Sequence, residues 1–574
     1  MTVTFNDIKE KADARWNELN SVRPWIRIGT ALCGQAAGAE EVADAFDSEL
    51  EARGFDATVS RVGCLGLCYA EPLVDILVPG RGRVVYGNVD VDMVSDLVED
   101  HLKTGQPVTD NVMGCRALGY VGEEIDGELE SLDQHPMRAR EQRIALRNAG
   151  HIDPLDIYQY VANGGYHALN RALTEITAAD VLEEVNVSGL RGRGGAAFPA
   201  GTKWRFLAGS NAPDKYILCN CEEGDPGAFN DKGILESDPH TVVEGIILAG
   251  YATGANHGYI FIRHGHDGPI DRTKAAIAQA YELGLLGENI LGSDFTFDLE
   301  VALTGDSYVS GEETALMEAI EGSRAMPRYR PPFPAQVGVF GKPTNINNVK
   351  TMAYVPEIVA RGGEWFAGIG HDKSTGTAIL CLSGNLKYTG MVEIPMGVNL
   401  NEVLYEVAGG VPGGKQLSFL QTGGPLGGVL SADATDLVLD FDIFRTAGAI
   451  LGSGGVIAAD EDTCVVDLTR VLIAFCQYES CGKCFPCRMG MSHMLEVLER
   501  ICRLEGTSDD LALMSSIGEN MQAGSLCGHG QLGFNPVASA LRYFPDQFQT
   551  HIVEKRCPTG RCQAPRFAPS LSRR

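Results

Sequence analysis

The sequence predicts a multidomain α/β protein that ends in a helical bundle. The chain is 574 residues long, which suits about four domains of ~150 residues each. Helical and strand-like periods alternate over the first 345 residues, as in an α/β fold, and helical periods dominate from residue 440 onward.

The N-terminal part, 1–105, has the element order of a thioredoxin-like domain. A βαβ unit leads into a hairpin. The predicted helices are 5–19 and 39–53, and the predicted strands are 25–28, 57–62 and 73–78. Residues 106–180 are polar, and we expect them to form a connector with helical pieces.

The rest of the chain divides into four further parts by composition and period. They are an α/β domain with several Gly-rich loops, a β-grasp (ubiquitin-like) module in which short β runs alternate with Gly and Pro, a helical domain, and a tail: 181–375, 376–435, 436–545 and 546–574.

The composition predicts a cytoplasmic chain that binds no nucleic acid and does not insert into a membrane. A net charge of −28 argues against the basic face that phosphate backbones need. Residues 1–20 are charged and polar, so no signal peptide is predicted, and the apolar runs are too short to span a bilayer. The 16 Cys residues are too sparse for a disulfide scaffold, and in a reducing compartment they stay free for metals.

Three cysteines at C-x2-C-x2-C spacing, Cys481, Cys484 and Cys487, give the most specific signal. One loop with this spacing holds three corners of a 4Fe–4S cluster and takes the fourth thiolate from elsewhere. Cys527, 40 residues further on, is the candidate. A zinc knuckle or a disulfide pair is the alternative, but zinc usually takes separated pairs of ligands. The pattern therefore predicts an iron–sulfur electron carrier.

A Gly-rich segment, 188–204, has the composition of a phosphate-binding loop. Its glycines allow backbone N–H groups to approach a phosphate, while Arg191, Arg193 and Lys203 add positive charge. Phe198 offers a flat surface for a ring. The segment follows a predicted helix, whereas a standard dinucleotide turn follows a strand. The alternative is a flexible loop that only turns the chain.

Polar side chains gather at three later places, two of them at the ends of predicted strands, where α/β sheets bind ligands. They form an acidic group, a pair of acids and a pair of amides: Asn220, Glu222, Glu223 and Asp225; Glu312 and Glu313; Asn347 and Asn348. Carboxylates there accept hydrogen bonds from ribose or ribityl hydroxyls, and amides suit the edge of an isoalloxazine or nicotinamide ring. For the first group, an acidic turn without a ligand is an equal alternative.

These four segments, in this order and ahead of 479–488, resemble the flavin-bearing, NADH-oxidising subunit of respiratory complex I, the 51 kDa-type diaphorase. The same module occurs in NAD-linked hydrogenases and formate dehydrogenases. The resemblance covers 181–545. It implies a Rossmann-like domain that binds FMN and NADH, and single-electron transfer through the 4Fe–4S cluster.

The resemblance also implies roles for individual residues. Glu313 is the expected catalytic residue, placed near the nicotinamide to favour a productive hydride geometry. The residues expected to bind FMN or NADH are Gly192, Arg193, Gly194, Gly195, Ala196, Phe198, Lys203, Phe206, Asn220, Glu222, Glu223, Asp225, Tyr308, Gly311, Glu312, Glu313, Asn347 and Asn348. The chain departs from the family pattern, with a bearing on nucleotide affinity, at Glu222, Gly224, Asp225 and Ser310.

The N-terminal domain resembles the thioredoxin-like 2Fe–2S module fused to the hydrogenase and formate dehydrogenase versions of this subunit. That module holds its cluster with a C-x4-C and a C-x3-C pair. Cys64 and Cys68 supply the second pair and Cys33 half of the first, but Ile28 stands where the other Cys belongs. Either a non-Cys ligand completes the site, or the cluster is lost and the domain serves docking. We favour loss, because isoleucine cannot ligate iron.

The tail carries a second metal signal. His551, Cys557 and Cys562 have zinc-like spacing, and Cys464 is the spare thiol that brings the set to four ligands. The arrangement resembles subunits of electron-bifurcating hydrogenases. The alternative is a pair of tail thiols without a metal.

The expected function is that of an NADH:acceptor oxidoreductase subunit, a diaphorase whose electrons pass to partner subunits. The expected partners are a small thioredoxin-like 2Fe–2S subunit and a larger iron–sulfur or catalytic subunit of a hydrogenase, a formate dehydrogenase or another low-potential reductase. Two alternatives stay open. One is a flavin-based electron-bifurcating subunit, and the other is a structural electron conduit that has lost NADH binding.

Overall fold

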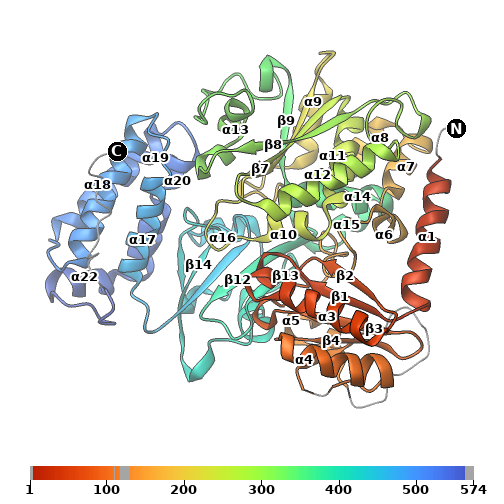
Figure 1. Ribbon diagram of the computed structural model, residues 1–574. Coiled ribbons are helices and arrows are strands. Elements are labelled where there is room, and N and C mark those ends of the chain that lie inside the picture. Colours follow the sequence, from red (N-terminus) through yellow and green to blue (C-terminus); the bar gives the residue numbers. More distant parts are fainter. Residues whose placement is uncertain (1–3, 109, 117–128, 563–574) are drawn as a thin grey trace.

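The computed structural model describes residues 4–108, 110–116 and 129–562. Its parts follow the predicted order along the chain (Figure 1): a small α/β domain, a larger α/β domain, a mixed β-sheet module and a group of C-terminal helices. The predicted multidomain α/β architecture is confirmed.

The N-terminal domain is a five-stranded sheet in the order β2-β1-β3-β4-β5. β1 and β2 are parallel and joined through α3, and β3 and β4 form an antiparallel hairpin, as predicted for a thioredoxin-like fold. Left-handed glycines, Gly38 and Gly54, flank α3. The bounds are β1 Trp25–Gly29, α2 Leu32–Ala36, α3 Ala39–Arg53, β2 Thr58–Val62, β3 Val74–Val78, β4 Gly82–Tyr86, α4 Val91–Asp96 and β5 Val112–Arg116.

Helix α1, Phe5–Ser21, leaves this domain and packs against α6, Ile157–Ala162. Its buried residues Phe5, Ile8 and Ala12 belong to the core of the larger domain. The predicted boundary, 1–105, assigns this helix to the thioredoxin-like domain, whereas in the structure it packs on the larger domain. Helical period alone identifies an apolar face, but it does not identify the surface that this face will cover.

The larger α/β domain has a parallel sheet in the order β8-β7-β6-β9. All four strands run the same way, so their carboxyl ends meet at one edge, where open α/β sheets bind ligands. The strands are β6 Tyr216–Cys221, β7 His257–Arg263, β8 Asp298–Thr304 and β9 Thr344–Asn348. The helices include α7 His167–Thr174, α8 Ala178–Val187, α9 Ala200–Ala208, α10 Asn230–Ser237, α11 Pro239–Thr253, α12 Asp267–Glu282, α13 Glu313–Ile320 and α14 Val349–Arg361.

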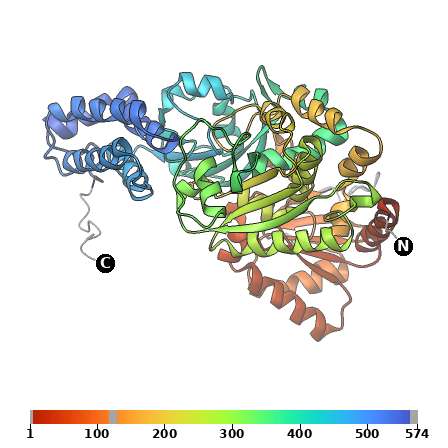
Figure 2. The ribbon, with the colours of Figure 1, turned by 90° about the horizontal axis from the view of Figure 1, so that it is seen from above.

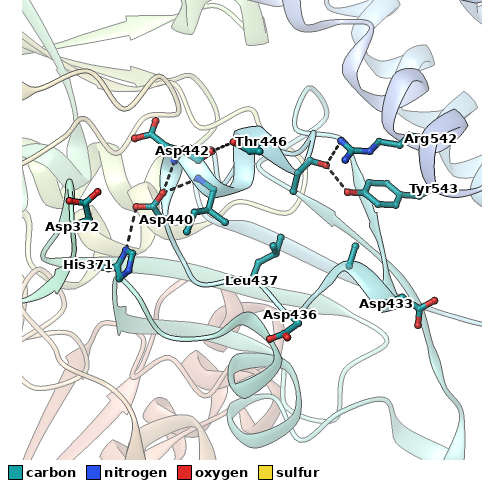
Figure 3. Close-up of a pocket in the computed structure, with 13 residues that line it drawn as sticks. His371, Asp372, Asp433, Asp436, Leu437, Asp440, Asp442, Thr446, Arg542 and Tyr543 are labelled. Atoms are coloured by element: carbon teal, nitrogen blue, oxygen red, sulfur yellow. Dashed lines mark hydrogen bonds and ion pairs between the residues drawn. The ribbon is translucent and has the colours of Figure 1, made fainter.

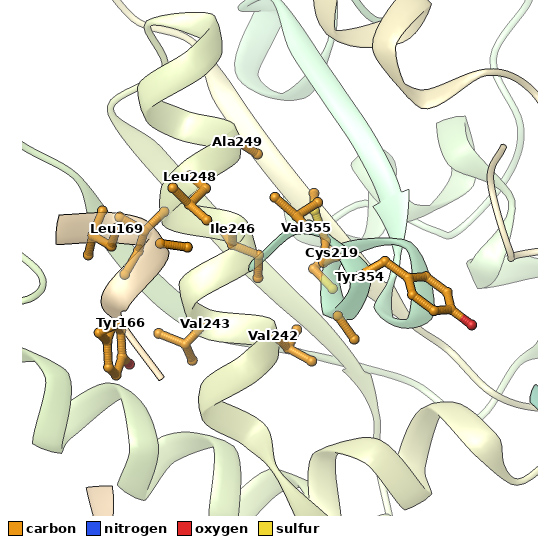
Figure 4. Close-up of a cluster of buried hydrophobic side chains, with 14 of the residues drawn as sticks. Tyr166, Leu169, Cys219, Val242, Val243, Ile246, Leu248, Ala249, Tyr354 and Val355 are labelled. Atoms are coloured by element: carbon orange, nitrogen blue, oxygen red, sulfur yellow. The ribbon is translucent and has the colours of Figure 1, made fainter. Parts of the chain in front are cut away.

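The core of this domain centres on α11, which is buried along nearly its whole length. Figure 4 shows Val242, Val243 and Ile246 of this helix among side chains from α7, β6 and α14. One acid, Glu244, is fully buried there and accepts hydrogen bonds from the Tyr160 hydroxyl and two backbone N–H groups. A helix apolar on all sides fits a buried central position.

The β-grasp module is a five-stranded mixed sheet in the order β13-β12-β16-β14-β15. Its strands are β12 Thr377–Gly384, β13 Gly390–Pro395, β14 Leu417–Thr422, β15 Val429–Ser431 and β16 Gly455–Asp460. The central strand β16 lies in the range predicted as helical, 436–545, so that part of the prediction is wrong. A short apolar run does not reveal by periodicity whether it forms a buried strand or a helix.

The C-terminal helices form a separate lobe, which projects from one side of the molecule in blue in Figure 2. They pack mainly on one another through Val465, Met494, Leu498 and Phe548. The helices are α17 Val465–Tyr478, α18 Phe485–Cys502, α19 Asp509–Gly524, α20 Gly528–Leu532, α21 Asn535–Tyr543 and α22 Pro545–Val553. None of the helices in the described part of the chain has both the length and the apolarity for a bilayer crossing.

Candidate active site

The Gly-rich loop between α8 and α9 forms an open cradle beside the carboxyl edge of the parallel sheet. A Cβ added at Gly194 would lie 3.0 Å from the Cβ of Asn348 at the end of β9. Gly195 has a φ of 121°, and an added Cβ there would meet no atom within 4 Å. The loop thus needs glycine to pass this close to the strand, and it leaves free space above.

The arginines of this loop contact distant parts of the chain. The buried Arg193 guanidinium donates to the carbonyls of Arg191 (2.8 Å), Thr375 (2.6 Å) and Thr377 (3.2 Å). Arg191 pairs with Asp442 at 2.9 Å. Both guanidinium groups therefore clamp the loop to the β-grasp module. Both arginines thus have partners within the protein, and their predicted contact with a phosphate stays a prediction.

Lys203 is the cation of the loop that remains near the open edge. Its Nζ forms an ion pair with Glu313 and donates to the carbonyl of Ile346 at 2.6 Å. Two aromatic rings beside it, Phe198 and Phe206, are 47% and 59% exposed. Exposed rings next to a cation offer the stacking surface and the charge that a dinucleotide needs.

Glu312 and Glu313 mark the start of α13. Glu312 caps the helix by accepting from the backbone N–H groups of Thr314 and Ala315 at 2.9 and 3.0 Å. Arg330 approaches both carboxylates, at 3.2 and 3.6 Å. Glu312 therefore has a structural task, whereas Glu313 directs its carboxylate to Lys203.

The acids after β6 have different partners. Glu222 pairs with Arg263 at 2.8 Å, and burial raises its pKa to about 9. Glu223 accepts from the backbone N–H groups of Asp231 and Lys232 at 2.8 and 2.9 Å, and so it fixes the start of α10. Sequence reasoning missed Arg263, although its position at the end of β7 is the signal that would have found it.

Asp225 has one carboxylate oxygen that the described residues leave unsatisfied. Its Oδ2 accepts from the Ser453 hydroxyl, while the buried Oδ1 has no hydrogen-bond partner there. Burial raises the pKa of this carboxyl to about 6. A buried carboxylate oxygen without a partner among the described residues, on the loop that follows β6, fits a polar ligand at this sheet edge.

The amides at the end of β9 are held rigidly. Asn347 accepts from the indole N–H of Trp204 at 3.0 Å. Asn348 donates to Asp231 at 2.6 Å, and Lys350 donates to the same carboxylate, also at 2.6 Å. Asn220, on the next strand, donates to the carbonyl of Gly311 at 2.8 Å. These contacts bring segments distant in sequence to one sheet edge.

Four thiols converge in the C-terminal lobe. Cys484 and Cys527 stand immediately before α18 and α20, and Cys487 lies in the first turn of α18. Burial and the neighbouring thiols of Cys481, Cys484 and Cys527 raise the pKa of Cys487 to about 12. This convergence at helix N-termini fits a 4Fe–4S cluster.

The thiol group adjoins the nucleotide edge. The backbone N–H of Tyr308 donates to Glu479 at 2.8 Å, and the Tyr308 ring packs edge-on against Phe475 with centroids 5.5 Å apart. The Nζ of Lys483, inside the cysteine motif, donates to the carbonyl of Pro327 at 2.7 Å. The chain therefore links the two candidate cofactor sites directly.

Two further thiol groups form as the sequence suggested. The ligand atoms of Cys464, His551, Cys557 and Cys562 all lie within 4.8 Å of one another, although 87 residues separate Cys464 from His551. In the N-terminal domain the three thiols predicted as a partial 2Fe–2S motif gather equally closely, as the ligands of a metal centre do: Cys33, Cys64 and Cys68.

A cleft of about 660 Å³ lies between the β-grasp module and α21 (Figure 3), and one of its lining residues, Asp442, is the partner of Arg191. Its acids have local tasks: Asp440 caps α16, Phe441–Thr446, and Asp436 accepts from Asn399 at 2.7 Å. An acidic lining repels phosphates, so this cleft does not suit a nucleotide.

Two family models match the chain. Residues 185–357 match the Nuo51 FMN-binding domain, and residues 467–551 match the NADH-ubiquinone oxidoreductase-F iron–sulfur binding region. The first range contains the glycine cradle and the sheet edge, and the second contains the four convergent thiols.

Individual relatives agree with these matches. The NADP-reducing hydrogenase subunit HndC of Solidesulfovibrio fructosivorans is 45% identical over 74% of this chain and 86% of its own length. A subunit of the NADH-quinone oxidoreductase of Rhizobium meliloti is 43% identical over 72% of this chain and 99% of its own. A solved NAD⁺-reducing NiFe-hydrogenase is similar over 95% of this chain and 87% of its own, with a TM-score of 0.64 and 27% identity.

Proposed function

The chain belongs to the family of NADH-oxidising subunits that carry the Nuo51 FMN-binding domain and the NADH-ubiquinone oxidoreductase-F iron–sulfur region, and we propose that it serves a hydrogenase-type complex. It is an enzyme subunit that takes electrons from NADH with FMN and passes them on through a 4Fe–4S cluster. FMN, when bound, accepts electrons in pairs and releases them singly, as an iron–sulfur cluster requires.

We infer the following tasks for the residues at the sheet edge. The backbone of 192–196 cradles the flavin phosphate, and Asn220, Glu222 and Asn348 hold its polar groups. Phe198 and Phe206 offer their exposed rings to NADH. Lys203 and Glu313 form the ion pair that orients the nicotinamide. Asp225 offers its buried Oδ1 to a polar group of the bound cofactors. The remaining predicted contacts, Glu223, Tyr308, Gly311, Glu312 and Asn347, support these groups through capping and packing.

The extent of the similarity to a hydrogenase chain supports the choice of a hydrogenase-type complex. The Rhizobium protein matches over 99% of its own length but over only 72% of this chain, so part of this chain has no counterpart in it. The NAD⁺-reducing hydrogenase chain covers 95% of this one. We therefore expect a small thioredoxin-like 2Fe–2S partner and a catalytic hydrogenase or another low-potential iron–sulfur partner.

A diaphorase assay tests this function. We expect the purified chain to release about one FMN on denaturation and to reduce ferricyanide with NADH. Because HndC is named as NADP-reducing, NADPH should be run in parallel to define the nucleotide. Bound FMN without activity toward either nucleotide would reject the diaphorase and favour the structural electron conduit.

We propose that the tail group binds one structural zinc ion. Cys464 and His551 approach to 3.5 Å between Sγ and Nε2, and His551 is oriented from its other ring nitrogen by the carbonyl of Gln547 at 2.7 Å. Four protein ligands leave no open position, so such a site is structural. The ion would tie the chain end after α22 to the start of α17.

About one zinc per chain should therefore accompany the tail group. Changing Cys557 and Cys562 to alanine together should remove that zinc and make the last helix more open to proteolysis. Flavin content and cluster iron should not change. A Cys381→Ala variant, which removes another buried thiol, is the matched control. Unchanged zinc in the double variant would contradict the assignment.

Electron bifurcation is the second candidate function, since a zinc-tied lobe offers a hinge between the cluster and the flavin edge.

A further inference from the structure

The N-terminal cysteine group contains a fourth side chain that the sequence pattern did not reveal. Glu71 follows Cys68 by three residues, and its Oε1 lies 3.6 Å from the Sγ atoms of both Cys33 and Cys64. The side chain is only 8% exposed. Its other oxygen accepts from the backbone N–H of Leu73 at 2.9 Å.

The fold places these four groups at one end of the sheet. Cys33 follows the end of β1 and Cys64 follows the end of β2, while Cys68 and Glu71 precede β3. A Cβ added at Gly29, the last residue of β1, would lie 3.3 Å from the Glu71 carboxylate. The acid therefore occupies the space beside the strand that carries isoleucine in place of the fourth cysteine.

Ile28 itself cannot take part, because it is buried on the apolar side of the sheet with the α3 residues Val42 and Phe46. Among the described residues, the hydrogen-bond partners of the Glu71 carboxylate are two thiols and a backbone N–H, and none of them is a cation. A buried carboxylate among thiols without a cation is costly, whereas a bound metal ion would compensate it.

The spacings around Cys33 and Cys64 fit one tetrahedral ion, and Glu71, which lies outside the group that the three thiols form within 4.8 Å, has to move toward Cys68 to complete the site. Zinc–sulfur bonds of about 2.3 Å place two thiolates about 3.8 Å apart, and a zinc–oxygen bond of about 2.0 Å places sulfur and oxygen about 3.5 Å apart. Here Cys33 and Cys64 are 3.4 Å apart, and Cys64 and Cys68 are 3.6 Å apart. A two-iron cluster would separate the ligands of its two irons further, yet all three thiols lie within 4.8 Å of one another.

We propose that Cys33, Cys64, Cys68 and Glu71 bind a single zinc ion. The thiols lose their protons on binding, and the site is closed by four protein ligands. Zinc has no redox chemistry, so this domain does not carry electrons. Its metal is structural.

The loops that carry the four ligands also contact the neighbouring domains, so the ion would stabilise the interface between them. Leu32, next to Cys33, donates its backbone N–H to Glu236 at 3.2 Å, and Arg272 donates to the carbonyl of Thr30 at 3.0 Å. The carbonyl of Gly66 accepts from Met391 of the β-grasp module at 2.9 Å. The loops that carry the ligands thus form the surface by which the N-terminal domain contacts the larger α/β domain and the β-grasp module.

The test uses the full chain with Cys557 and Cys562 replaced by alanine, so that zinc in the tail does not interfere. We expect about one zinc per chain in this background. Adding Cys64→Ser should remove it, and Glu71→Gln should lower zinc affinity at least about tenfold in competition with a chelator, the least that the loss of even an outer-shell partner costs. Cys115→Ser, in the same domain, is the control and should keep the zinc.

Cobalt substitution gives a second readout that does not depend on how well a variant folds. Cobalt in the Cys115→Ser control should show the visible bands of a tetrahedral thiolate site, and Glu71→Gln should shift them. Two irons per chain beyond the 4Fe–4S content, lost with Cys64→Ser, would overturn the proposal in favour of a 2Fe–2S cluster. A metal-free domain, or zinc retained at full affinity in Glu71→Gln, would also overturn it.

Discussion

Replacing Cys527 with serine should abolish electron delivery from this chain to its partner while NADH still reduces ferricyanide. The two activities separate because ferricyanide can take electrons from the flavin directly, whereas a protein partner needs the 4Fe–4S cluster. Cys527 stands immediately before α20, and its buried thiol converges with those of Cys481, Cys484 and Cys487. A serine oxygen is a poor ligand for an iron–sulfur cluster, which is held by thiolates.

The measurement combines EPR of the dithionite-reduced chain, iron content and the two activities. We expect the cluster signal to disappear or change strongly, and partner reduction to fall to background. The matched control is Cys381→Ala, which removes a buried thiol from β12, outside the motif. An unchanged cluster in Cys527→Ser would assign the fourth ligand to another residue.

Sequence reasoning predicted a feature correctly where the residues that determine it lie within one short segment. The boundaries 39–53 of α3 were predicted correctly, because an amphipathic run ends at a glycine that adopts left-handed φ. The cysteine spacing at 481–487 identified the cluster because one loop must supply three ligands. The polar group after β6 was expected at the carboxyl end of its strand, where α/β sheets bind ligands.

The sequence failed where a side chain's partner comes from a distant part of the chain. The sequence did not indicate that the Arg193 guanidinium contacts the carbonyls of Thr375 and Thr377, about 180 residues away. Helix α1 looked like part of the first domain, but its face covers another core. Glu71 gave no signal at all, since an isolated acid after a cysteine motif acquires meaning only when Cys33 is brought beside it.

Glu313→Gln should lower NADH turnover while FMN stays bound. The Glu313 carboxylate pairs with Lys203, whose Nζ also donates to the carbonyl of Ile346 at 2.6 Å, so the two charges fix each other at the open edge. A neutral amide of the same size removes the charge that holds Lys203 in place. We expect roughly a hundredfold loss of turnover, the size of effect that a misplaced catalytic geometry produces.

The flavin should remain because its proposed cradle, the glycine loop with Asn220 and Asn348, does not contain this carboxylate. Released FMN and the KM and kcat for NADH are the readouts, and a loss confined to kcat indicates misplacement of the bound nucleotide rather than weaker binding. The control is Glu318→Gln on the same helix, which also breaks an ion pair, with Arg328 at 2.6 Å, yet should leave turnover unchanged. If Glu313→Gln kept full activity, or if both variants lost activity alike, Glu313 would have no place at the nicotinamide.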